Sequence, residues 1–362
     1  MRHLVTLLPL IPLLAACSSE PKPAELAPPE SLVKSGFVLE PEHAIHPLGG
    51  DFADNPAAER FIDKMVSEHG FERQQLHDVL AQAQQLDWVV RLMDKQAPAG
   101  QPSTRPNGAW LRYRSKFLTP DNVQNGVVFW NKYEEALQRA SQIYGVPPEI
   151  IVGIIGVETR WGRVMGKTRI IDALATLSFN YPRRAEYFSG ELATFLLMAR
   201  AEGDDPLSLR GSYAGAMGYG QFMPSSFKSY AVDFNGDGHI NLWDPVDAIG
   251  SVANYFKAHG WTRGATVAVP ANGQAPGLET GFKTRYSVAT LAAAGLTAQG
   301  SLEGNQDVSL LRLDMGNRYQ YWFGLPNFYT ITRYNHSVHY SMAVWQLGEA
   351  VGRARAGSDV SG

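Results

Sequence analysis

Residues 147 to 162 read Pro-Pro-Glu-Ile-Ile-Val-Gly-Ile-Ile-Gly-Val-Glu-Thr-Arg-Trp-Gly. Proline at the start and glycine at the end are typical of the two ends of a helix. Almost every residue between them is apolar, so the helix has no polar face to turn to water. This stretch therefore predicts a helix that lies in the core of the protein.

Glu158 is the exception inside this apolar run, because its helical neighbours three and four positions away are Ile154, Ile155 and Trp161. Loss of water raises the pKa of a carboxyl group, by up to about 3 to 5 units when burial is complete. A glutamic acid that keeps its proton at neutral pH can act as a general acid. The alternative is a structural glutamate that is neutralised by Arg160 or Arg163.

A second motif lies at residues 211 to 225, which read Gly-Ser-Tyr-Ala-Gly-Ala-Met-Gly-Tyr-Gly-Gln-Phe-Met-Pro-Ser. Its glycines allow the backbone to approach a ligand closely. Its tyrosines, glutamine and serines offer polar groups to such a ligand. The alternative is a glycine-rich turn that only packs against the core.

Residues 233 to 244 read Asp-Phe-Asn-Gly-Asp-Gly-His-Ile-Asn-Leu-Trp-Asp, which is the pattern of an EF-hand calcium loop with glycine at position 6. The predicted calcium ligands are Asp233, Asn235, Asp237, the backbone carbonyl of His239, and Asp244. The last position is usually a glutamate, so the shorter Asp244 predicts weaker binding. Asp244 followed by Pro245 is also a good start for a helix, and the two interpretations can hold together.

The first residues predict export. A charged start and an apolar run, too short to span a bilayer, lead to Leu14-Ala15-Ala16-Cys17, which resembles the bacterial lipobox. We expect cleavage before Cys17 and lipidation of its thiol; the alternative is an ordinary cleaved signal. Residues 18–40 contain several prolines and predict a flexible tether.

Composition sets wider limits. The chain has 362 residues, a net charge of -3, and 44% hydrophobic residues. It can therefore bury a substantial core in more than one domain, and its charge gives no reason to expect nucleic-acid binding.

Residue spacing and helix-breaking residues give a coarse secondary structure. The patterns predict four further helices, from Pro56 to about Gly70, over Leu76 to Val90, over Val127 to Tyr144 with a stop at Gly145, and over Ser341 to Val351. They also predict short strands in 265–323 and a strand-like run from Asn327.

Four segments together resemble the membrane-bound lytic murein transglycosylase B family, a group of lysozyme-like lytic transglycosylases. They are the Glu-Thr-Arg-Trp-Gly motif of Glu158, the Gly-Tyr-Gly-Gln-Phe-Met-Pro-Ser motif, the acidic loop and Tyr334-Asn335-His336. The resemblance extends over essentially the whole chain. It implies a mainly helical α+β fold with a lysozyme-like catalytic core, a helical N-terminal domain and a small inserted strand-rich domain. The implied divisions are a signal at 1–17, a tether at 18–40, a helical domain at 41–144, the core at 145–264 with the loop at 233–244, the strand-rich domain at 265–325, and a returning segment at 326–362.

The resemblance also implies roles. Glu158 falls on the family's acid/base, which cleaves the β-1,4 bond between N-acetylmuramic acid (MurNAc) and N-acetylglucosamine (GlcNAc) of peptidoglycan without water and leaves 1,6-anhydro-MurNAc. The resemblance implies one structural calcium ion. The implied partners are peptidoglycan strands, the outer membrane of a Gram-negative bacterium and other cell-wall enzymes, and the implied location is the periplasm. The positions that match the family's substrate cleft are Ser212, Gln221, Tyr113, Arg184, Tyr255, Tyr334, Asn335 and Tyr340.

Two other functions stay open from the sequence. A muramidase that uses water normally needs a second carboxylate about 5 to 10 Å from the first, and Asp172, Glu186 and Glu191 are close enough in sequence to be considered. A calcium-stabilised lipoprotein that binds peptidoglycan without cleaving it would need Glu158 only for structure.

Overall fold

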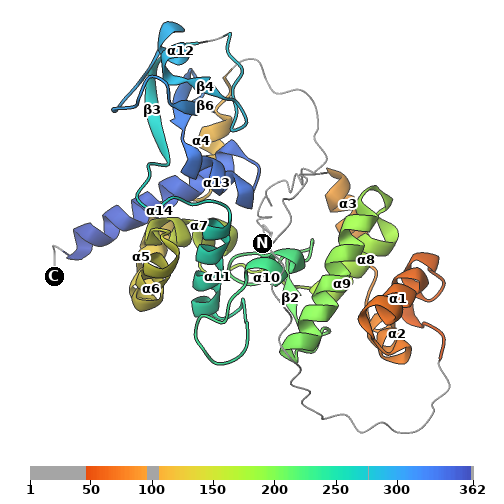
Figure 1. The fold of residues 1–362 in the computed structure, drawn as a ribbon. Coiled ribbons are helices and arrows are strands. Elements are labelled where there is room, and N and C mark those ends of the chain that lie inside the picture. Colours follow the sequence, from red (N-terminus) through yellow and green to blue (C-terminus); the bar gives the residue numbers. More distant parts are fainter. Residues whose placement is uncertain (1–45, 96–105, 276, 360–362) are drawn as a thin grey trace, which may run out of the picture.

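A computed structural model describes residues 46–95, 106–275 and 277–359, which form a mainly helical body with one five-stranded sheet (Figure 1). This confirms the predicted α+β class. The predicted lipidation site Cys17 and the tether at 18–40 lie outside the described residues.

Two helices from distant parts of the chain form the centre of the core. Helix α7 (Pro148–Thr159) is buried on nearly every face, as its apolar sequence predicts, and α14 (Val338–Asp359) packs along it. Glycines allow this close contact: a Cβ atom at Gly153 would lie 2.3 Å from the carbonyl oxygen of Val344, and one at Gly348 would lie 2.0 Å from that of Glu149. Side chains at the end of α7 and the start of α14 are therefore held side by side.

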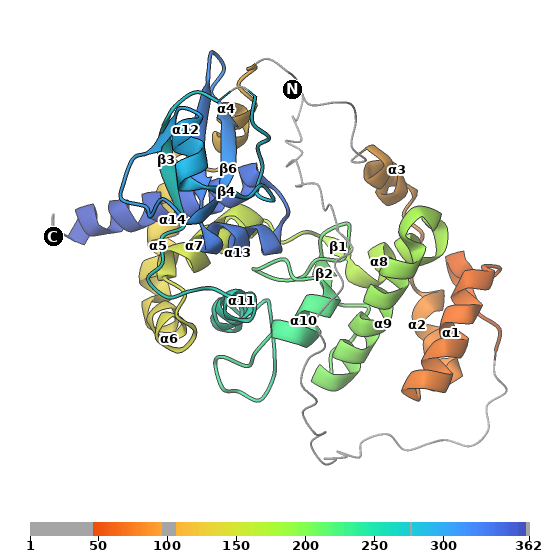
Figure 2. The same cartoon turned by 45° about the horizontal axis from the view of Figure 1, so that its top comes forward.

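The first three helices, α1 (Pro56–His69), α2 (Arg73–Ala81) and α3 (Asp87–Lys95), lie beside α8 (Ile170–Asn180) and α9 (Ala185–Glu202) (Figure 2). Helix α1 begins and ends where the sequence predicts, with Asn55 as its N-cap and Gly70 as its C-cap.

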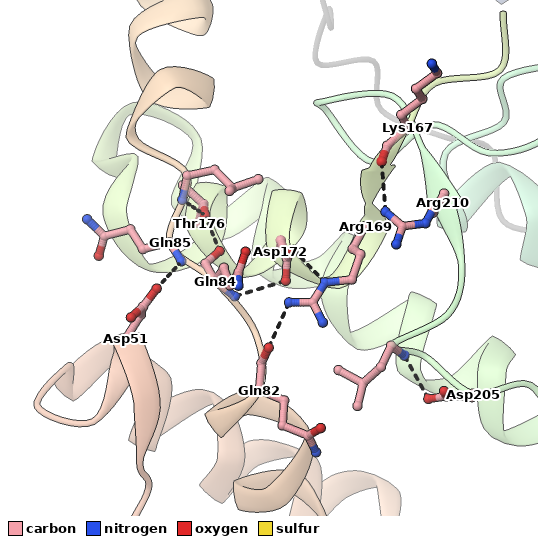
Figure 3. Close-up of polar contacts among 12 residues, drawn as sticks. Asp51, Gln82, Gln84, Gln85, Lys167, Arg169, Asp172, Thr176, Asp205 and Arg210 are labelled. Carbon is pink, nitrogen blue, oxygen red and sulfur yellow. Dashed lines mark hydrogen bonds and ion pairs between the residues drawn. The ribbon is translucent and has the colours of Figure 1, made fainter.

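The single helix predicted over Leu76 to Val90 is wrong, because the chain leaves the helix between α2 and α3. There the backbone N–H groups of Gln84 and Leu86 donate to the side chains of Asp172 and Thr176 on α8, each at 2.9 Å (Figure 3). Side chains from another helix thus replace the carbonyl acceptors that a continuous helix would have supplied.

The single helix predicted over Val127 to Tyr144 is also two helices, α5 (Pro120–Lys132) and α6 (Glu134–Tyr144), because Tyr133 departs from helical geometry with φ -117° and ψ 27°. Helix α5 packs on α14 and α7, and α6 packs on α7 and on α11 (Pro245–Ala258). The two halves of the predicted domain 41–144 therefore pack on different parts of the chain. The domain boundaries themselves stay a prediction.

The predicted strands within 265–323 are confirmed. Strands β3 (Ala268–Gly273), β4 (Tyr286–Ser287), β5 (Leu296–Ala298), β6 (Asp307–Asp314) and β7 (Tyr319–Gly324) form an antiparallel sheet in the order β4-β6-β7-β3-β5. Its inner face and α12 (Val288–Ala293) enclose a separate hydrophobic cluster that includes Leu291 and Phe323.

The strand-like run predicted from Asn327 is wrong, because α13 (Pro326–Tyr334) is a helix that begins at Pro326 and packs against β7 and α14. Packing of its buried face overrides the strand preference of its aromatic and β-branched residues. The remaining elements are η1 (Gly50–Phe52), α4 (Ala109–Arg114), β1 (Thr168–Arg169), η2 (Pro182–Arg184), β2 (Arg210–Gly211) and α10 (Pro224–Tyr230).

In the described part of the chain, no helix alone has the length and apolar composition needed to cross a membrane. Helices α6 and α7 meet those criteria only when taken together, and they are bent by 117° where they join.

Candidate functional site

Glu158 lies in the last turn of α7, where its side chain is partly exposed although most of the helix before it is buried. The hydroxyl of Tyr340, at the start of α14, donates to its Oε1 atom at 2.6 Å. Across residues 46–95, 106–275 and 277–359, no basic group lies within 4.0 Å of this carboxylate. Arg163 bonds to Asn125 instead. The predicted alternative of a glutamate neutralised by a neighbouring arginine is therefore wrong.

Burial raises the pKa of Glu158 to about 7, although the hydrogen bond from Tyr340 acts in the opposite direction. Protein atoms surround the carboxyl group closely enough to remove most of its hydration, which disfavours the charged form. At neutral pH the protonated and ionised forms are both well populated. The same group can therefore give a proton and take one back.

Three of the predicted cleft tyrosines lie around Glu158: Tyr113, Tyr334 and Tyr340. Burial raises the pKa of each hydroxyl, and the negative charge of Glu158 adds to the shift. Tyr334 donates to the carbonyl oxygen of Gly220 at 2.5 Å, and its ring is parallel to that of Tyr340. The Tyr113 hydroxyl is buried and has no hydrogen-bond partner within the described ranges. It is available to a ligand beside the acid.

The glycine-rich segment adjoins the end of α7, because the Thr159 hydroxyl lies 3.0 Å from the carbonyl oxygen of Tyr219. Within the segment, the Ser212 hydroxyl accepts the N–H of Ala216 at 2.9 Å. The Gln221 amide donates to the Gly218 carbonyl at 2.9 Å. Both predicted substrate contacts thus stabilise the turn in this structure.

The other predicted cleft residues have different surroundings. Tyr255 is buried, donates to the carbonyl oxygen of Arg333 at 2.7 Å, and packs edge-on against Tyr334. The Arg184 guanidinium lies over the ring of Tyr187, 4.4 Å from its centre. Asn335 follows α13 in an extended conformation and is partly exposed. None of the three is hydrogen-bonded to Glu158 in the described structure.

In the acidic loop, Asp233 accepts the N–H groups of Gly238 at 2.9 Å and Gly236 at 2.6 Å, and these bonds lower its pKa. Asn235 and Asp237 also accept N–H groups within the loop. No three His, Cys, Asp or Glu side chains of the described residues are arranged as a metal site. Even so, the loop offers carboxylate, amide and carbonyl oxygens, which are the ligands that calcium prefers.

At the end of the loop, Asp244 caps α11, because its carboxylate accepts the N–H groups of Val246 and Asp247 at 2.7 and 3.3 Å. The helix-start interpretation of Asp244 and Pro245 is thus confirmed. Asp247, which is fully buried, accepts N–H groups at both ends of the loop, from Asn235 and Asn241, each at 2.9 Å. It is therefore Asp247 that ties α11 to the loop interior.

Comparison with known proteins agrees with the family that the sequence motifs resemble. Residues 53–349 match the model of the family described as "Transglycosylase SLT domain". The chain belongs to the transglycosylase SLT domain family.

Among relatives in this transglycosylase family, membrane-bound lytic murein transglycosylase B of Escherichia coli (strain K12) is 74% identical over 356 residues, which cover 98% of this chain and 99% of that protein. The structure of the Escherichia coli lytic transglycosylase Slt35 in complex with calcium is 75% identical, with a TM-score of 0.84, and covers 88% of this chain and 100% of its own. SltB3 of Pseudomonas aeruginosa, solved in complex with NAG-anhNAM-pentapeptide, is 29% identical with a TM-score of 0.70 over 82% of this chain and 78% of its own. The predicted family and lysozyme-like fold are confirmed.

Sequence reasoning missed two residues of this transglycosylase site and one of its loop. His339 lies beside both Trp110 and Tyr113, with ring centres 5.5 and 5.6 Å away, and burial lowers its pKa. The three-residue spacing of Trp110 and Tyr113 could have suggested one helix face. Asp247 was missed because it lies beyond the twelve-residue pattern of an EF-hand loop.

Proposed function

We propose that the protein is a lytic transglycosylase that cleaves the β-1,4 bond between MurNAc and GlcNAc in peptidoglycan without consuming water. The observation that carries this proposal is Glu158: its carboxyl group has a pKa of about 7, is hydrogen-bonded to Tyr340 and, among the residues that the structure describes, pairs with no cation. The family match and the names of the relatives support the same reaction.

In the first step, protonated Glu158 gives its proton to the glycosidic oxygen as the bond from that oxygen to C1 of the muramic sugar breaks. Positive charge develops at C1, and the carboxylate left behind keeps the hydrogen bond from Tyr340 at 2.6 Å. A hydrogen bond to an ionised acceptor is stronger than one to a neutral group. Tyr340 therefore stabilises the product of proton transfer.

In the second step, the Glu158 carboxylate takes the proton of the muramic C6 hydroxyl, and O6 bonds to C1 to close the 1,6-anhydro ring. Glu158 regains its proton, so the cycle closes with one carboxyl group and no water. The buried Tyr113 hydroxyl, which has no partner within the described ranges, is a donor for the sugar at this position.

Two of the three carboxylates considered for a hydrolase are engaged elsewhere. Asp172 pairs with Arg169 at 2.7 Å, and Glu191 accepts the hydroxyl of Ser225 at 2.6 Å. Glu186 is exposed on α9. These contacts favour the water-independent reaction over a two-carboxylate hydrolysis.

The remaining sugar contacts are proposals that rest on the resemblance. Ring faces of tyrosines pack against sugar C–H groups, and amide and guanidinium groups bind acetamido and carboxylate oxygens. The complex of SltB3 with NAG-anhNAM-pentapeptide supports a peptidoglycan ligand. The residues proposed for these contacts are Ser212, Gln221, Arg184, Tyr255, Tyr334 and Asn335.

One structural calcium ion is part of the proposal, supported by the calcium complex of Slt35. Its ligands would be Asp233, Asn235, Asp237 and the His239 carbonyl. For the closing carboxylate we favour Asp247 over Asp244, because Asp247 contacts the loop backbone at Asn235 and Asn241, whereas the Asp244 carboxylate contacts the start of α11.

We also propose a periplasmic location with a lipid anchor on Cys17 in the outer membrane, where the enzyme would meet peptidoglycan strands and other cell-wall enzymes. The relative's description as membrane-bound supports membrane association.

The test is digestion of purified sacculi by the full chain in detergent, followed by mass spectrometry of the fragments. Fragments lighter than the hydrolysis products by one water molecule are expected. Reducing ends would instead indicate a muramidase. Binding without cleavage, together with an unchanged effect of Glu158→Gln, would indicate a non-catalytic binding protein.

A further inference from the structure

A pocket that Glu158 does not line lies beside the β1–β2 pair. This open pocket of about 720 Å³ is lined by residues of the segment between α2 and α3, of β1 and β2, and of the start of α8. In Figure 3, Arg169 donates to the Gln82 carbonyl at 2.8 Å, and Lys167 and Arg210 lie farther from Gln82 and Gln84. The hydrogen bonds that interrupt the helix at Gln84 and Leu86 also fix the wall of the pocket that these two residues line.

The pocket carries an excess of positive charge. Of its lining residues, three are cationic and one, Asp172, is acidic. Asp172 is neutralised by Arg169 at 2.7 Å. Lys167 and Arg210 are exposed and form no ion pair in the described part of the chain; the Arg210 guanidinium donates to the Lys167 carbonyl at 3.0 Å, which leaves further N–H groups open. Two cations thus face solvent without a carboxylate partner.

An indole lies beside these charges. Trp88 lines the same pocket with 43% of its surface exposed, whereas tryptophan is usually highly buried. An aromatic face next to open N–H donors is suited to a sugar that carries an anionic group, because the ring covers sugar C–H groups while the cations bind oxygens.

The pocket adjoins the segment that leads to the catalytic centre. Thr168 pairs with Gly211 across the two strands, and Ser212 follows directly. The ring of Tyr213, the next residue, is 6.5 Å from that of Trp88. The pocket and the glycine-rich segment are therefore neighbours, through β1–β2 and through the contact between Trp88 and Tyr213.

We propose that this pocket is a secondary binding site for the peptidoglycan strand, in which Trp88 packs against a sugar ring and Lys167 and Arg210 bind carboxylates of the attached stem peptide. The proposal rests on the function proposed above and adds a substrate contact away from Glu158. It gives the enzyme a preference for long strands that carry peptides.

The experiment compares Trp88→Ala and Lys167→Glu with the wild type, using the full chain in detergent. The substrates are long peptide-bearing strands, long strands freed of peptides by an amidase, and a peptide-bearing tetrasaccharide. We expect Lys167→Glu to raise the KM for peptide-bearing strands about tenfold relative to the tetrasaccharide, because it replaces a charge-assisted contact by repulsion. The effect should disappear on peptide-free strands.

Trp88→Ala should raise the KM for both kinds of long strand about threefold to tenfold, because the aromatic contact is to the sugar. Trp88→Phe, which retains an aromatic face, should recover most of this loss. Lys228→Glu on α10 introduces the same charge change at an exposed position outside the pocket. It should leave all three KM values unchanged.

The same changes are also made in a Glu158→Gln background, and equilibrium binding to the strands is measured. This separates the two proposals, because binding does not require the reaction. Equal binding and equal KM values for Trp88→Ala, Lys167→Glu and the wild type would overturn the pocket proposal even if anhydro products are formed. Weaker binding of the pocket variants would uphold it even if the products show a different reaction.

Discussion

Two carboxylates of this chain have opposite properties. Glu158 is surrounded by protein in the last turn of α7, and burial raises its pKa to about 7. Asp233 is exposed at the start of a loop, and the N–H groups of Gly238 and Gly236 hold its pKa below the usual value. The same chemical group is prepared as a proton donor in one place and as a permanent anion in the other. Surroundings, and not residue type, decide which.

The two sites also differ in the sequence separation of the residues that form them. The partner of Glu158 is Tyr340, 182 residues away, whereas Asp233 takes its N–H groups from residues three to five positions along. The acid depends on correct packing of α14 against α7, and the loop depends on local glycines. We expect the acid to be sensitive to changes in the packing of α7 and α14, and the loop to depend also on the buried Asp247 of α11.

The largest expected effect is on catalysis. Glu158→Gln should lower kcat on sacculi by about 10²-fold to 10⁴-fold, because the side chain can no longer give or take a proton. The same substitution at the exposed Glu186 is the control and should retain full activity. Activity of the Glu158→Gln enzyme near that of the wild type would contradict the role of the acid.

The same substitution should change stability in a pH-dependent way. The pKa of Glu158 is raised from 4.5 in the unfolded chain to about 7 in the fold, so the folded protein holds its proton more tightly. This contribution to stability is complete below the lower value and is lost as pH rises through the upper one. At pH 8 the Glu158→Gln protein should be more stable than the wild type by at most roughly 3 kcal/mol. Urea unfolding at pH 4, 6 and 8 measures the difference in unfolding free energy between the two proteins. A difference that does not change with pH would count against a buried acid.

Calcium should stabilise the protein by binding to the acidic loop at 233–244. At a calcium concentration a hundred times Kd, the free energy of unfolding should rise by about 2.7 kcal/mol relative to chelated protein. Asp233→Asn and Asp247→Asn should lose most of this increase. Asp244→Asn should keep it, because asparagine also caps helices well. Thermal melts with and without calcium test this, and loss of the response in Asp244→Asn alone would restore the twelve-residue loop as the binding unit.

Tyr340→Phe tests the hydrogen bond that Tyr340 donates to Glu158. A hydrogen bond to an ionised group is worth about 1.5 to 3 kcal/mol, so kcat should fall about tenfold or more. The bond lowers the pKa of Glu158, so its removal should raise that pKa and extend activity to higher pH. The pH dependence of kcat/KM measures the shift. Tyr329→Phe, at an exposed position of α13, is the control, and an unmoved alkaline limb in Tyr340→Phe would contradict the contact.

A further expected effect concerns the packing of α7 against α14. Gly153→Ala should destabilise the fold by about 1 to 3 kcal/mol, because its Cβ would meet the backbone of α14, and should separate Tyr340 from Glu158. Gly190→Ala lies in α9, where a Cβ meets no neighbour within 4 Å, and should stabilise by up to about 1 kcal/mol. Equal unfolding free energies for the two variants would show that α7 and α14 can adjust without cost.

Local patterns predicted much of this protein correctly. The apolar run at Pro148–Thr159, the caps at Asn55 and Gly70, and the short strands after residue 265 follow from residue preferences within a few positions. The predictions failed where distant groups act on the backbone. The interruption between α2 and α3 is set by side chains of α8, about ninety residues along the chain.

The sequence by itself determined which groups are present and their local geometry: an isolated glutamate in an apolar helix, and an acidic loop with glycines at its bends. Only the tertiary structure decided that Tyr340 rather than an arginine contacts Glu158, that Asp247 ties α11 to the loop, and that Lys167 and Arg210 share a pocket with Trp88. The physical reason is that hydration and charge depend on what surrounds a group in space, and these neighbours come from parts of the chain that residue spacing does not relate.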